Sequence, residues 1–142
     1  MHPEHHLRDE FYNAITHGLG AFLSVIGGIV LIVLAMLNGD VWQQASAIVF
    51  SVSLVGLYGA STLYHSTHEP KAKLRYKILD HCMIYVLIAG SYTPFTLIAM
   101  RDDGGWWIFG ISWAIALAGI IFKLFFTGRF ELLSTLMYLA MG

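Results

Sequence analysis

The feature that most limits the fold of this chain is a series of four long stretches that contain no Asp, Glu, Lys or Arg. They are Leu19–Leu37, Val41–Tyr64, His81–Met100 and Gly104–Phe122. Each is close to the ~20 residues that a helix needs to cross the apolar part of a bilayer. Charged residues make up 12% of the 142-residue chain, about half the share found in soluble domains. The sequence therefore predicts an all-α, polytopic transmembrane helix bundle and excludes a soluble core.

The whole of residues 1–142 is expected to form one membrane domain. A polar tail is followed by four full spans and the beginning of a fifth, over about 1–12, 13–37, 41–66, 78–100, 104–126 and 130–142. The first span is too long for a signal peptide. The last apolar segment is too short to cross the membrane and ends without a polar flank, so we expect this chain to be a fragment of a longer protein.

The basic residues lie almost entirely on one side of the predicted membrane. Of the eight Lys and Arg residues, only Arg101 falls on the other side. The remaining seven are Arg8, Lys71, Lys73, Arg75, Lys77, Lys123 and Arg129. Loops rich in Lys and Arg stay in the cytoplasm. We therefore expect a multi-pass protein of the cell (inner) membrane, with a cytoplasmic N-terminus and a cytoplasmic loop over residues 70–77.

Three of the predicted spans carry polar side chains to the same depth, near the cytoplasmic face. Asn13 and His17 lie at the inner end of the first span, Ser61 and His65 at the inner end of the second, and Asp80 in the first turn of the third. Residues four apart share a helix face. Ionisable groups inside an apolar span are costly and are candidates for a functional site. We expect Ser61, His65 and Asp80 to share one pocket, with Asn13 and His17 as a supporting polar cluster.

Each of these side chains also has a purely structural interpretation. Ser61 can bond a backbone carbonyl of its own helix, His65 can reach water at the interface, and Asp80 can pair with a basic residue at the helix end. Together they suit either nucleophilic catalysis or a metal site. A triad hydrolase needs the histidine between the serine and the carboxylate, and catalytic zinc usually has three protein ligands. The residues alone leave these alternatives open.

Several short motifs resemble those of the bacterial hemolysin III proteins, which belong with the progestin and adiponectin receptor family. They are Asn13–Gly20, Ser61-x-x-x-His65, Leu79–His81, Ile88–Phe95 and Ser134–Gly142. The resemblance implies seven helices and a zinc ion near the cytoplasmic side. It further implies that His65 is a zinc ligand, that Asp80 holds the metal-bound water and that Ser61 lies beside it. The family's other two zinc-binding histidines belong to a seventh span that is absent from this sequence.

The leading hypothesis is a zinc-dependent intramembrane hydrolase of lipid amides or related acyl substrates. A zinc-bound water would attack the substrate, and Asp80 would accept a proton. The alternatives are a membrane-lytic or pore-forming protein, for which the spans offer no polar stripe, and a receptor-like or structural protein. We expect the lipid bilayer, and a lipid substrate, as partners, and no nucleic acid. Residues 1–142 alone are expected to bind zinc weakly or not at all and to be inactive.

Overall fold

The structure of the protein, a computed structural model, describes residues 3–126 and 131–142. Its helices are α1 (Pro3–Asn38), α2 (Val41–Ser66), α3 (Pro70–Pro94), α4 (Trp106–Phe126) and α5 (Glu131–Met141). Four of the described helical segments are long and apolar enough to cross a membrane. The prediction of an all-α transmembrane bundle is therefore confirmed.

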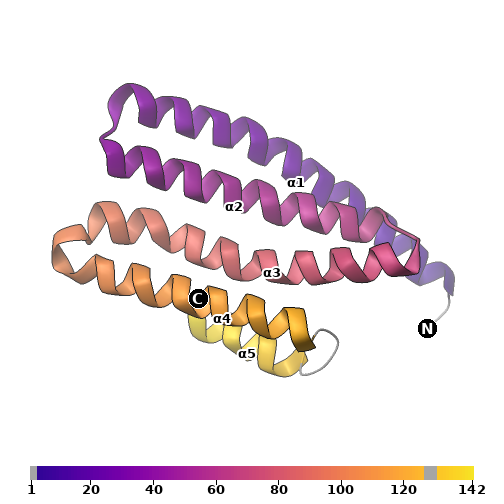
Figure 1. Ribbon diagram of the computed structural model, residues 1–142. Coiled ribbons are helices and arrows are strands. Elements are labelled where there is room, and N and C mark those ends of the chain that lie inside the picture. Colours follow the sequence, from indigo (N-terminus) through magenta and orange to yellow (C-terminus); the bar gives the residue numbers. More distant parts are fainter. Residues whose placement is uncertain (1–2, 127–130) are drawn as a thin grey trace.

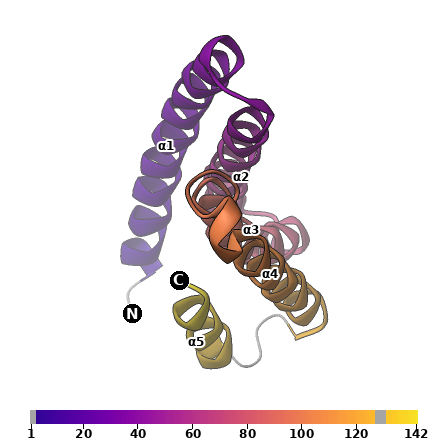
Figure 2. The same ribbon diagram turned by 90° about the vertical axis from the view of Figure 1, so that its left-hand side faces the viewer.

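The first four helices lie side by side in alternating directions (Figure 1). α1 packs on α2, α2 on α3 and α3 on α4, while α5 lies against both α3 and α4. Figure 2 shows this row from its end, with α1 and α4 on opposite sides. The N-terminus and the connection between α2 and α3 therefore share one end of the bundle. We call it the basic end, after Arg8, Lys71, Lys73, Arg75 and Lys77.

Two segments that the sequence suggested to be a tail and a loop are helical. α1 begins at Pro3, inside the expected tail, and α3 begins at Pro70, so the expected loop over residues 70–77 is its first two turns. The reason at α3 is local. Glu69 accepts hydrogen bonds from the backbone N–H groups of Lys71 (3.0 Å) and Ala72 (2.6 Å), and proline suits the first position of a helix.

The opposite end of the bundle contains two tight connections. Between α1 and α2, Asp40 accepts from the N–H groups of Trp42 and Gln43, and the Gln43 side chain accepts from the Asp40 N–H in return. This reciprocal capping box fixes the start of α2. Between α3 and α4, a π-helical turn, η1 (Phe95–Ala99), follows Pro94, where proline removes a helical hydrogen bond. The next segment, η2 (Arg101–Gly105), is a kink in which Gly104 has a φ of 86°.

Many large apolar side chains are exposed on the outer surface, whereas most of the buried side chains are small ones such as Ala, Ser and Thr. Phe22, Trp107 and Phe125 are all more than half exposed. A buried cluster of Tyr85, Ala89, Ala116 and Met141 joins α3, α4 and α5. Helices in a bilayer associate through close packing of small residues, because lipid tails are as apolar as the side chains. The exposed apolar surface therefore fits a lipid environment.

Candidate functional site

Polar side chains from three helices meet in one cavity at the basic end of the bundle. His17 of α1, Ser61 and His65 of α2, and Asp80 of α3 all line a space of about 260 Å³. Its remaining walls are Leu57, Tyr58 and Ile84. The cavity exists because α1 and α3 both start, and α2 ends, at this end of the bundle (Figure 1). The structure thus brings together Ser61, His65 and Asp80, the three residues expected to share a pocket.

Ser61 lies next to His17 in this cavity. Ser61 is buried, and its Oγ lies 2.6 Å from Nδ1 of His17. The carboxylate of Asp80 lines the same cavity as this hydroxyl. A serine hydroxyl has one proton to donate and can also accept, so Ser61 can link His17 to Asp80. The order is histidine, serine, carboxylate, whereas a triad hydrolase places its histidine in the middle.

A second group of polar contacts lies closer to the end of the bundle, and sequence reasoning missed two of its members. Oε2 of Glu10 lies 3.1 Å from Nδ1 of His65 and 2.8 Å from Nζ of Lys73. The side chains of Glu10 and His65 are each 14% exposed. Three helices are therefore joined through one carboxylate oxygen, and His65 belongs both to this group and to the cavity.

Asn13 and His81 lie differently from the central residues. Asn13 is exposed and is not among the side chains that line the cavity, because the outward side of α1 carries it. His81 places Nδ1 at 3.6 Å from Oδ2 of Asp80. This distance is too long for a hydrogen bond. His81 is therefore a neighbour of Asp80 that does not line the cavity.

Zinc is implied by the family resemblance, and the donor types here suit it, since imidazole and carboxylate both bind zinc. The number of donors among the described residues, however, is too small for a zinc site. Among residues 3–126 and 131–142, no three His, Cys, Asp or Glu side chains lie close enough to hold a metal ion. The described residues therefore supply only part of a zinc site.

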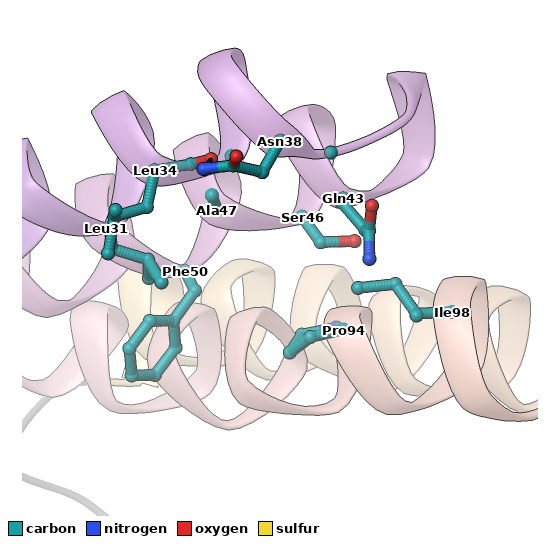
Figure 3. Close-up of a pocket in the computed structure, with 11 residues that line it drawn as sticks. Leu31, Leu34, Asn38, Gln43, Ser46, Ala47, Phe50, Pro94 and Ile98 are labelled. Atoms are coloured by element: carbon teal, nitrogen blue, oxygen red, sulfur yellow. Dashed lines mark hydrogen bonds between the residues drawn. The ribbon is translucent and has the colours of Figure 1, made fainter.

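A second cavity, of about 320 Å³, lies at the opposite end of the bundle. Figure 3 shows Leu31 and Leu34 of α1, Phe50 of α2, and Pro94 and Ile98 around it. Its lining contains no titratable side chain. This cavity is suited to an apolar group and lacks the means for acid–base chemistry, so the candidate site is the one at the basic end.

The helices define a multi-pass membrane protein with a cavity lined by polar side chains at one end of the bundle. The sequence model of the haemolysin-III related proteins matches residues 5–142. The chain therefore belongs to that family, which confirms the resemblance drawn from its motifs.

Individual relatives agree with this assignment. "Hemolysin-3" of Bacillus cereus is 48% identical over 136 residues, which are 96% of this chain and 62% of the relative. "Hemolysin-3 homolog" of Bacillus subtilis (strain 168) is 47% identical over 136 residues, 96% of this chain and 64% of the relative. The human "Monocyte to macrophage differentiation factor" is 28% identical over 141 residues, 92% of this chain and 56% of the relative. The chain thus spans less than two thirds of the length of each. No solved structure matched.

Proposed function

We propose that this protein is a zinc-dependent intramembrane hydrolase of lipid amides or related acyl substrates, with its site at the basic end of the bundle. The supporting observation is that His17, Ser61, His65 and Asp80 converge from three helices on one cavity. Burying these groups within an apolar bundle costs free energy unless they pair with one another or serve a purpose there. Zinc as the cofactor, with His65 as one ligand, rests on the family resemblance.

The residues of the cavity suit the proton transfers of amide hydrolysis. Hydrolysis joins the oxygen of water to the carbonyl carbon, breaks the carbon–nitrogen bond and delivers a proton to the leaving amine. A positioned base must take the proton of the water. Asp80 is the candidate base, because its carboxylate lines the cavity. Ser61 lines the same cavity as that carboxylate, and its hydroxyl is held by His17.

A second chemistry is favoured by one specific distance. The 2.6 Å contact between Ser61 Oγ and His17 Nδ1 is the geometry of a serine nucleophile and its base. In that case the serine oxygen would bond to the carbonyl carbon while His17 takes the hydroxyl proton and passes it to the leaving amine as the carbon–nitrogen bond breaks. Water would then hydrolyse the resulting serine ester and release the fatty acid. The two mechanisms differ in what removing the hydroxyl does. Ser61→Ala would abolish catalysis by a nucleophilic serine, but would only impair catalysis in which Asp80 activates water.

We further propose that the basic end faces the cytoplasm, because loops rich in Lys and Arg are retained on that side. The name of the bacterial relatives, "Hemolysin-3", adds membrane lysis as an activity to be tested. Lysis requires no hydrolysis, so the two are separable in one experiment that follows both the release of a trapped dye and the cleavage of a lipid amide.

The test uses the whole protein in vesicles that contain a fluorogenic long-chain acyl amide and a trapped dye. We expect release of the amine and the fatty acid, and loss of this activity when zinc is removed. Asp80→Asn should slow hydrolysis by about 10²- to 10⁴-fold, while the exposed Asp9→Asn serves as the matched control. Dye release without amide cleavage, or cleavage that is unchanged in Asp80→Asn, would contradict the proposed function.

Zinc content gives an independent measurement. In the whole protein, zinc should be stoichiometric and should fall sharply in His65→Ala. Residues 1–142 alone should retain little zinc after dialysis, because the described residues contain no cluster of three ligands. Stoichiometric zinc in residues 1–142 that is lost in His65→Ala would show that this account of the ligands is wrong.

A further inference from the structure

The polar residues at the basic end form two layers. His17, Ser61 and Asp80 make up the inner layer, and Glu10 and Lys73 belong to the outer one. Glu10 precedes His17 by seven residues, and Lys73 precedes Asp80 by seven. Seven residues are about two helical turns, a rise of about 10 Å on the same face. α1 and α3 therefore repeat the same spacing on either side of α2.

His65 connects the two layers. Its Nδ1 lies 3.1 Å from Oε2 of Glu10 in the outer layer. Its ring packs edge-to-face on His17 of the inner layer, with 5.4 Å between ring centroids, and it lines the cavity. A neutral imidazole that donates from Nδ1 carries its lone pair on Nε2. The lone pair is therefore on the ring nitrogen that is not bound to Glu10.

Lys73 holds the carboxylate of Glu10, which in turn contacts His65. Its Nζ lies 2.8 Å from Oε2 of Glu10, and 3.4 Å from the carbonyl oxygens of both Tyr64 and Thr67. It also lies over the Tyr64 ring, 4.8 Å from its centroid. A lysine at the last carbonyls of α2 is favoured there by the helix dipole. Glu10 is thus held by a cation that is itself anchored to the end of α2.

We propose that Glu10, held by Lys73, is a positioning residue that keeps neutral His65 in the Nδ1–H tautomer and directs its Nε2 to a metal ion. This deepens the proposed function, because it rests on His65 being a zinc ligand. Histidines that bind metals commonly donate their other N–H to a carboxylate, which fixes both the tautomer and the ring orientation. A salt bridge that merely held the helices together would require neither a particular tautomer nor a particular ring orientation of His65.

The first experiment needs no metal and reads the tautomer directly. Residues 1–142 with ¹⁵N-labelled histidine are placed in lipid bilayers without zinc, and the His65 signals are assigned by their loss in His65→Gln. Solid-state NMR then distinguishes a protonated from an unprotonated ring nitrogen. We expect Nδ1 protonated and Nε2 unprotonated. Glu10→Ala should shift the ring toward the Nε2–H tautomer, and the exposed neighbour Asp9→Ala should not.

The conservative variant separates positioning from folding. Glu10→Gln keeps an amide oxygen that can accept from Nδ1–H, so it should restore much of the wild-type tautomer that Glu10→Ala loses. An Nε2–H tautomer, or protonation of both nitrogens, in the wild type would overturn the proposal. So would a wild-type tautomer in Glu10→Ala. Circular dichroism on each variant verifies that the helices are intact.

The second experiment measures zinc in the whole protein by competition with a chelator. Glu10→Ala should raise the zinc dissociation constant by about 10- to 100-fold. Lys73→Met should raise it by less, and the matched variant Lys71→Met, at an exposed position in the first turn of α3, should leave it unchanged. An unchanged zinc affinity in a Glu10→Ala protein whose tautomer has shifted would refute the positioning role. If the wild type binds no zinc while the tautomer depends on Glu10, the zinc-dependent function fails but the contact with His65 stands.

Discussion

Replacing Gly20 of α1 with alanine tests whether the site depends on the close approach of α1 and α2. A Cβ atom at Gly20 would lie 2.7 Å from two carbons of the Tyr58 ring, and Tyr58 is a wall of the cavity. Carbon atoms in contact normally lie about 3.5–4.0 Å apart, so the helices must separate, or the ring must move, by roughly 1 Å. A separation of that size would stretch the 2.6 Å contact between His17 and Ser61 to roughly 3.6 Å, beyond hydrogen-bonding range.

The energetic cost follows from a matched variant on the same helix. Gly27→Ala adds the same methyl group where no other atom lies within 4 Å. Both substitutions gain about the same helix propensity, ~1 kcal/mol, so this gain cancels in the comparison. The remaining difference is overpacking, about 1–3 kcal/mol. Gly20→Ala should therefore be less stable than Gly27→Ala by that amount.

Equilibrium unfolding in mixed micelles measures the free energy of each variant, and ¹⁵N signals of His17 report its contact with Ser61. Gly20→Ala should lose both stability and the His17 contact, while Gly27→Ala keeps them. If the two variants were equally stable and gave the same His17 signals, the close packing of α1 on α2 would not control the site, and the reasoning would be wrong.

Three further outcomes are expected. A cysteine at Ala72, in a protein whose buried Cys82 is changed to serine, should react with an impermeant maleimide in inverted vesicles and not in intact cells; labelling of intact cells would reverse the orientation. The backbone N–H groups that Glu69 caps hold the pKa of its carboxyl below the usual value. The cap therefore stabilises α3 fully above the ordinary glutamate pKa, and this stabilisation is lost as the pH falls through the lowered pKa. Hydrogen-exchange protection of the first turn of α3 should fall over that pH range in the wild type and should not in Glu69→Gln. Gly105→Ala, whose methyl group would meet backbone carbonyl oxygens, should lose at least about 1–3 kcal/mol relative to Gly110→Ala, which meets nothing within 4 Å.

The fold class could be predicted because a bilayer imposes a simple length rule on uncharged segments. The alternating direction of the spans then placed Ser61, His65 and Asp80 at one depth, and the structure places all three on one cavity. Helix ends were harder to predict. The lysines after Glu69 suggest a loop, although the Glu69–Pro70 pair is itself a signal for the start of a helix.

Glu10 and Lys73 were missed because polarity was used as a measure of depth. Both lie outside the uncharged runs, so Glu10 was assigned to a solvated tail and Lys73 to a basic loop. Their spacing in the sequence does connect them with the site, since each lies seven residues, or about two helical turns, before a member of the predicted site. A search for polar residues at i−7 from His17 and Asp80 would have found both. Their shared contact with one carboxylate oxygen, however, depends on how three helices pack, which spacing alone does not determine.

The residues that attach α1 to the bundle are also those that build the site. In a bilayer, no hydrophobic force draws α1 toward α2, because lipid covers its apolar side chains equally well. Its described attachments are close contacts at glycines such as Gly20 and Gly28 and two polar links at the basic end, through Glu10 and His17. A ligand that strengthens either polar link must therefore also hold α1 more firmly. Zinc bound at His65, as proposed, should accordingly raise the protection of α1 backbone amides near Glu10 and leave those near Asn38, at the other end of the helix, unchanged.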